Sequence, residues 1–195
     1  MTRLCTYVVR EDTGLAPNPF WGWCTLAVCT PNRMGVRLQT GDVIAGSLTK
    51  ARDHAFLFAM IVDEVLDLDA YFHDCRFSKK KPDLRGNWMA RCGDNFYSRG
   101  PNGWVQHKNP LHWGEQYKTR DTRHAVAFVG ERFWYRGQLA TSLPMEFQRL
   151  FGGSGVRITL DADTVVAFVD WVARSFPEGV GGLPNDNPDL VGKAR

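Results

Sequence analysis

One run of the chain, residues 55–66, is apolar at nearly every position and constrains the fold more than any other stretch. It has eight apolar residues in succession before its first charged residue, Asp63. A strand with one face in solvent alternates apolar and polar side chains, whereas a strand covered on both faces does not. The run therefore predicts a central strand that is buried on both sides.

Shorter runs with strand character lie before and after this central run. They are rich in β-branched and aromatic residues and are bounded by glycine, proline, asparagine or aspartate: residues 4–9, 23–29, 43–45 and 156–160. Two further runs, residues 125–129 and 132–135, are separated by Gly130-Glu131. Glycine at the first position of a two-residue loop suits a type II′ turn, so these two runs predict a β-hairpin.

Capping residues predict three helices. Asp67 or Asp69 can cap a short helix over residues 68–72, and Ser142 before a proline begins a second helix that ends by residue 152. Asp161 or Asp163 caps a third helix, whose apolar residues recur at helical spacing and form one buried stripe: Val165, Val169, Val172 and Phe176.

This order of elements predicts an α+β fold. Strands and helices do not alternate regularly, which disfavours a doubly wound parallel sheet. A small twisted antiparallel sheet, or a small β-barrel, with helices at its rim fits better. Residues 93–124 show little periodicity and predict a long irregular connection, which in a compact domain is usually functional or mobile.

The length of 195 residues, an apolar fraction of 44% and seven tryptophans support one hydrophobic core. We expect a single domain over residues 1–180. Residues 181–195 carry no core pattern and are expected to form a flexible tail.

The sequence predicts a cytoplasmic protein without a membrane span, since no apolar run approaches the roughly 20 residues required and the N-terminus lacks a signal-peptide pattern. Five cysteines at irregular spacings predict reduced, mostly buried thiols rather than a disulfide framework. Histidine and cysteine show no paired zinc-type spacing, so neither a bound metal nor another cofactor is expected.

A basic stretch, residues 76–91, is the first candidate for binding. It contains Lys79, Lys80, Lys81 and Arg85, and such clusters can neutralise backbone phosphates, although the net charge of the chain is only +3. Phe77 and Trp88 are interleaved with these cations, as in surfaces that stack single-stranded bases. The alternative is an ordinary solvated loop.

Aromatic residues after a rigid turn form the second candidate. Asn18 stands between two prolines, and Phe20, Trp21 and Trp23 follow it, so these aromatic rings could enclose a planar base beside the amide of Asn18. The alternative is that most of them fill the core.

Two further segments carry polar groups at the ends of predicted elements. Ser47, Thr49, Lys50 and Arg52 follow a strand and could bind a phosphate. The second segment opens the irregular connection. In it Asp94 could transfer a proton, Asn95 could pair with a base edge, and Tyr97 could stack on a base or donate a proton. The alternative proton-transfer groups are His73, His107 and His112. Ordinary turns account for both segments equally well.

A set of short motifs, occurring in order between residues 4 and 135, resembles the family called nucleotide modification associated domain 2. The motifs are Tyr7-Val8-Val9, Ala16-Pro17-Asn18-Pro19-Phe20 with Gly22, Cys24-Thr25-Leu26-Ala27, Gly41-Asp42, Phe58-Ala59-Met60, Tyr71 with Arg76-Phe77, Lys80-Lys81-Pro82, Leu84-Arg85-Gly86 and Gly93-Asp94-Asn95-Phe96-Tyr97. The resemblance implies a bacterial or phage domain that accompanies systems making or sensing hypermodified DNA bases. It implies a partner that is a nucleic acid, DNA more than RNA, or a nucleotide. The Gly41-Asp42 turn and the apolar run also resemble part of a PUA-like barrel, an architecture of several modified-base readers.

Three hypotheses about function follow. A reader would hold a modified or flipped base between aromatic rings while lysines hold the flanking phosphates. An enzyme would act on a base, nucleoside or nucleotide, with Asp94, Tyr97 or His73 transferring protons. A protein-interaction module would use the exposed aromatic rings to bind another chain.

Overall fold

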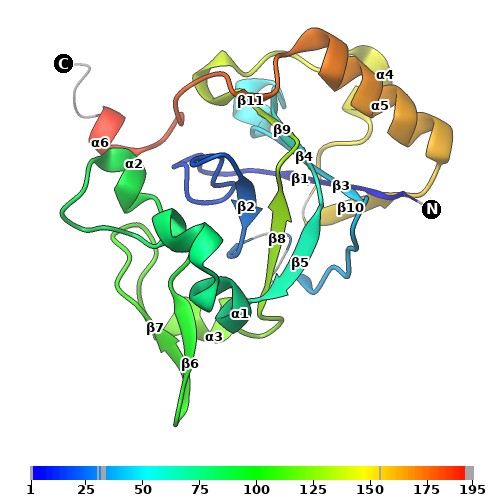
Figure 1. Cartoon of the computed structure of the whole chain (residues 1–195). Coiled ribbons are helices and arrows are strands. Elements are labelled where there is room, and N and C mark those ends of the chain that lie inside the picture. The colour runs from blue at the N-terminus through cyan, green and yellow to red at the C-terminus, as the bar shows by residue number, and fades with distance from the viewer. Residues whose placement is uncertain (1, 30, 32–33, 154, 192–195) are drawn as a thin grey trace.

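The computed structural model describes residues 2–29, 31, 34–153 and 155–191. Its largest sheet has the strand order β10-β1-β3-β4-β9-β11 (Figure 1). The strands are β1 Leu4–Val8, β3 Val43–Ser47, β4 Phe56–Ile61, β9 Phe133–Tyr135, β10 Val156–Thr159 and β11 Gly179–Val180. The pairs β1–β3 and β9–β11 are parallel and the others antiparallel, so this sheet is mixed rather than antiparallel throughout.

The apolar run forms the central strand β4 only as far as Ile61. Its residues 56–60 are almost completely buried and contribute to the core on both faces of the sheet. The expectation of one strand over residues 55–66 is wrong beyond this point, because the chain turns at Asp63 and enters β5 (Glu64–Asp67) in another sheet. The burial of β5 alternates, as expected for a strand with one face in solvent.

A second sheet has the antiparallel order β2-β8-β5, with β2 at Cys24–Leu26 and β8 at Val126–Gly130. The predicted hairpin over residues 125–135 is wrong, since β8 and β9 belong to different sheets and Gly130 does not adopt the positive φ of a type II′ turn. Glycine fits there for another reason: a Cβ atom would lie 2.3 Å from the carbonyl oxygen of Ile61.

The two faces of the large sheet are covered differently. On one face its side chains share a buried cluster with the second sheet, including Tyr7, Phe58 and Phe128. On the other face lie the predicted helices α4 (Met145–Gln148) and α5 (Ala162–Ser175), as Figure 1 shows. Asp161 caps α5, and Val165, Phe168 and Val172 form its buried stripe.

The remaining elements form a third region around α1 (Leu68–His73), which Asp67 caps as predicted. It includes the 3₁₀ helix η3 (Cys75–Lys80) and α2 (Trp88–Arg91). The expected irregular connection over residues 93–124 instead contains a hairpin and a helix: β6 Tyr97–Gly100, β7 Gly103–Gln106 and α3 Glu115–Asp121. Figure 1 shows this hairpin projecting from the molecule.

The C-terminal segment, defined as residues 181–191, is packed against the domain in contrast to the expected flexible tail. The backbone of Gln138, at the 3₁₀ helix η4 (Gly137–Leu139), donates to the carbonyl of Leu183, and Asn187 is buried. The short helix α6 (Pro188–Val191) lies beside α2, where Arg91 is 3.4 Å from Asp189 (Figure 1). Residues 192–195 of the expected tail lie outside the described residues.

The α+β class, with a twisted sheet flanked by helices, is confirmed, and the described strands do not close into a barrel because β10 and β11 are sheet edges. None of the helices in the described part of the chain is long and apolar enough to cross a bilayer. Cys5, Cys24 and Cys92 are buried, Cys29 is half-buried and Cys75 is exposed.

Candidate functional site

The aromatic loop, residues 18–25, presents one tryptophan to solvent. Asn18 and Thr25 close the loop through two backbone hydrogen bonds of 2.9 Å. At its tip Trp21 has φ +65° and Gly22 has φ +85°. A left-handed conformation is uncommon for tryptophan and has to be held by the surrounding structure. It leaves the Trp21 side chain 37% exposed, whereas Phe20 is 3% exposed.

Lys80 anchors this loop from inside the protein. Its ammonium donates hydrogen bonds of 2.8 Å to the backbone and side-chain oxygens of Asn18 and to the carbonyl of Trp23. Lys80 is 1% exposed, and burial lowers the pKa of its ammonium to about 8. The expectation that Lys80 contacts a phosphate is therefore not met, because its donors are already used within the core.

Asp94, Asn95 and Asn18 also lie in the interior. Asp94 accepts hydrogen bonds of 2.8 Å from the hydroxyls of Thr25 and Tyr71, and burial raises the pKa of its carboxyl. Asn95 donates to the carbonyl of Tyr71, and Asn18 donates to the carbonyl of Cys92. These side chains join the loops to one another, so the structure does not present them to a base or a substrate.

A hollow of about 520 Å³ lies beside the exposed face of the aromatic loop and is called the Trp21 hollow. Its volume is within the range of small-molecule sites, about 300–1,000 Å³. Several segments supply its lining: Pro19, Phe20, Trp21 and Gly22 of the loop, Met89 of α2, Glu131 and Phe133 around the start of β9, and Glu178, Gly179 and Val180 at β11. The lining thus combines aromatic and apolar side chains with two carboxylates at its rim.

The lysines around Lys80 lie in different places. The Lys79 ammonium is 5.4 Å from the centre of the Trp21 ring, beside the hollow, whereas that of Lys81 is 3.9 Å from the Phe72 ring. Trp23 is half-buried and packs edge-on against Phe77 at 5.3 Å. Among the expected base- and phosphate-binding residues, the structure therefore brings together Phe20, Trp21 and Lys79.

The expected phosphate site at the end of β3 lies elsewhere. Ser47 is buried, and Arg52 donates to Asp186 of the C-terminal segment with a 3.0 Å hydrogen bond. Thr49 is half-buried and Lys50 is exposed beside Arg52. Arg85 is exposed on the loop between η3 and α2. The structure does not place these residues in the lining of the Trp21 hollow.

The candidate proton-transfer residues form two groups near the hairpin. The Nε2 atom of His112 lies 2.6 Å from a carboxylate oxygen of Asp121, and Tyr97 donates to the same oxygen at 3.1 Å. Burial raises the pKa of the Tyr97 phenol. His107 stacks on Phe72 at 4.5 Å, and His73 is exposed next to this pair.

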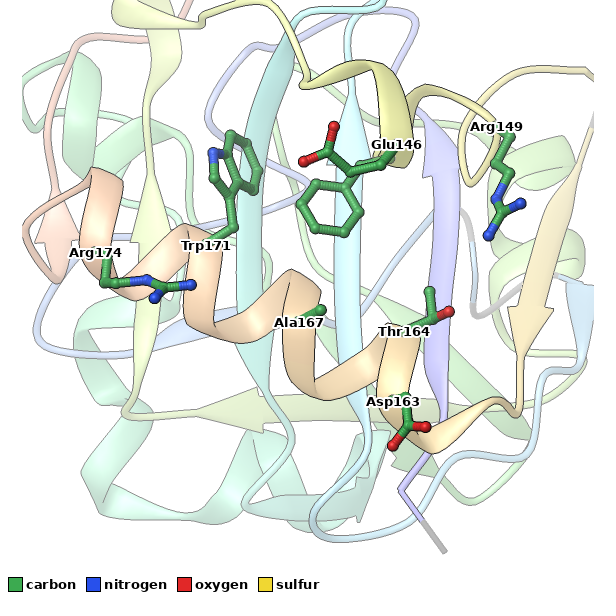
Figure 2. A pocket seen from close by; sticks show the side chains of 8 residues that line it. Glu146, Arg149, Asp163, Thr164, Ala167, Trp171 and Arg174 are labelled. Carbon is green, nitrogen blue, oxygen red and sulfur yellow. The ribbon is translucent and has the colours of Figure 1, made fainter.

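A second hollow, of about 470 Å³, lies between α4 and α5 on the far side of the large sheet (Figure 2). Figure 2 shows side chains of both charges around it, among them Glu146, Arg149, Asp163 and Arg174, with the Trp171 indole between Arg174 and Glu146 in this view. None of the candidate binding or proton-transfer residues proposed from the sequence lines this hollow. Acids and bases alternate around it, so its lining favours neither a phosphate nor a cation.

The sequence did not identify the residues that line the Trp21 hollow from outside the aromatic loop. Met89, Glu131, Phe133, Glu178 and Val180 come from segments far apart in the chain. No local motif marks them, because the pairing of β9 with β11 brings the residues around these strands together, and Met89 comes from α2. In the described part of the chain, no group of three histidine, cysteine, aspartate or glutamate side chains is arranged to hold a metal ion.

Comparison with known proteins gives one result. A family model described as nucleotide modification associated domain 2 matches residues 1–189. No curated protein and no solved structure matches the chain.

Proposed function

The chain belongs to the nucleotide modification associated domain 2 family, and from this membership we propose that it binds a nucleotide or nucleic acid, DNA rather than RNA, and holds one modified or flipped base in the Trp21 hollow. The family's description relates the chain to nucleotide modification. Such a role fits the cytoplasm, where DNA and nucleotide pools are accessible.

One observation carries this proposal: an exposed indole lines a hollow of nucleotide size beside a lysine ammonium. A base stacked on an aromatic side chain gains about 1–3 kcal/mol, and this gain depends little on the base because every base has a π-face. Lys79 lies where it can neutralise the phosphate of a nucleotide whose base contacts Trp21. No catalytic group is required for this activity.

The test compares matched tryptophan variants. Trp21→Ala should weaken binding of a short single-stranded DNA by about 5- to 150-fold, the equivalent of one stacked base. The control is Trp113→Ala, which removes another exposed indole, 53% exposed, on the loop after β7. Fluorescence anisotropy with labelled oligonucleotides measures both affinities, and equal affinities for the two variants would contradict the proposal.

A second comparison concerns the phosphate. Lys79→Ala should lower the slope of log affinity against log salt by about one unit, because one phosphate contact is lost. Lys108→Ala is the control, since Lys108 is also exposed, whereas it is Lys79 whose ammonium lies over the Trp21 ring. Unchanged slopes in both variants would remove Lys79 from the binding site.

An enzyme acting on a base, nucleoside or nucleotide is a second candidate, favoured by the His112–Asp121 pair. The Asp121 carboxylate holds Nε2 of His112, which leaves Nδ1 as the ring nitrogen able to exchange a proton. Incubation with modified nucleotides followed by mass spectrometry tests this candidate. Turnover that persists in His112→Gln would exclude this histidine as the acid or base.

A further inference from the structure

The rim of the Trp21 hollow carries negative charge on the side formed by β9 and β11. Glu131 and Glu178 both line the hollow, and both are exposed to solvent. Phe133 of β9 and Trp21 of the aromatic loop also belong to the lining. Carboxylates beside aromatic rings are unsuited to a phosphate, since they would repel it.

The charges around this rim do not cancel. Glu178 accepts a 2.7 Å hydrogen bond from Arg132. The carboxylate of Glu131 forms no ion pair with any residue that the structure describes, and the backbone of Glu131 donates to a third acid, Asp63. The only lysine or arginine cation placed over the Trp21 ring, within the described residues, is the ammonium of Lys79.

We infer that the Trp21 hollow selects a nucleotide whose base carries a positively charged substituent, such as a primary amine on a short alkyl arm. This inference rests on the proposed function and names its substrate class. The base stacks on Trp21 with its phosphate toward Lys79, and the substituent extends toward Glu131 and Glu178. An alkyl ammonium stays protonated at neutral pH because its pKa is about 10, and aromatic faces with nearby carboxylates stabilise such a cation.

The lining should discriminate, by affinity, between a base with a charged substituent and a base with a neutral one. A hydroxyalkyl substituent of the same length would contact the same apolar atoms of Phe133 and Val180. It would gain no charge attraction from Glu131. The difference between the two substituents is therefore electrostatic, and it should shrink as salt screens exposed charges.

The test uses two single-stranded DNAs that differ at one base, a uracil that carries either a 2-aminoethyl or a 2-hydroxyethyl group at C5 in place of the methyl group of thymine. The parent protein should bind the amine form more tightly by about two- to fivefold for each exposed carboxylate. Glu131→Gln should remove most of this preference, because the carboxylate of Glu178 already pairs with Arg132. A variant that also carries Glu178→Gln should remove the remainder. Glu146→Gln, an exposed acid on α4, is the control.

The outcomes separate this inference from the proposed function. Equal affinity for both DNAs, with binding still lost in Trp21→Ala, would overturn the amine preference and leave the base-binding proposal standing. No binding of either DNA would overturn both. A lysine-containing peptide that binds through Trp21 when neither DNA binds would assign the hollow to a protein partner and overturn both as well.

Discussion

Replacing Lys80 with methionine tests the buried anchor of the aromatic loop. The variant keeps most of the side-chain volume but removes an ammonium that donates to three oxygens, two on Asn18 and one on Trp23. A hydrogen bond from a charged group contributes about 1.5–3 kcal/mol, and part of this sum is recovered because the desolvation penalty of the ammonium disappears. We expect a net loss of about 3 kcal/mol in the free energy of unfolding.

Urea unfolding followed by circular dichroism measures this loss. With a slope of about 2–3 kcal/mol per molar, the midpoint should fall by about 1–1.5 M. Lys79→Met is the matched control, and as a surface change it should stay within about 0.5 kcal/mol of the parent. Equal urea midpoints for the two variants would refute the reasoning, because the buried Lys80 would then contribute no more to stability than the exposed Lys79.

The pH dependence of the same comparison has a defined sign. In the folded protein the pKa of Lys80 is lowered from 10.5 to about 8, so between these values the unfolded chain binds more protons at this position. Stability increases with pH wherever the unfolded state binds more protons. The stability difference between the parent and Lys80→Met should therefore widen from pH 8 to pH 10.5. A difference that narrows over this window would contradict the lowered pKa.

Three further changes test other parts of the structure. Arg76 lowers the pKa of Glu64 below 4.5 and that of Asp74 below 3.8. The parent should therefore have a slightly higher free energy of unfolding than Arg76→Ala above pH 4.5, and this difference should vanish as the pH falls through the lowered pKa values. A difference that stays constant in acid would contradict this pairing. Gly93→Ala should lower the thermal midpoint and reduce the free energy of unfolding by about 1–3 kcal/mol. The reason is that the new Cβ would lie 2.2 Å from the carbonyl oxygen of Lys80. An unchanged midpoint would show that this backbone can shift freely. Removing the C-terminal segment should also destabilise the domain in urea, whereas a flexible tail would be lost without effect.

The sequence predicted local features well. The Asp67 and Asp161 caps, the apolar stripe of α5 and the buried centre of the large sheet all depend on residues close together in the chain. Short-range hydrogen bonds and helical spacing determine such features. The choice of partner strand does not follow from them, and the sequence therefore predicts β5 as part of the central strand and pairs β8 with β9.

The candidate site was predicted only in part for a related reason. Phe20, Trp21 and Lys79 could be proposed from composition alone, because exposed aromatic and basic residues are typical of nucleic-acid surfaces. Whether Asp94 and Lys80 face solvent or the core depends on contacts with Asn18 and Tyr71, which are distant in sequence. The burial of a charged residue cannot be predicted from the sequence when its neighbours in the chain are also polar.

The three consecutive lysines of η3 and the residue after it have a practical consequence for chemical modification. An acylating reagent applied to the native protein should reach Lys79, which is exposed, and react more slowly with the half-buried Lys81. It should leave Lys80 unmodified, because this amine lies in the core and its three protons are already donated. Acylation of Lys80 would thus require the core to open. The rate at which the label appears at Lys80, measured by peptide mass mapping, would therefore report the rate of unfolding.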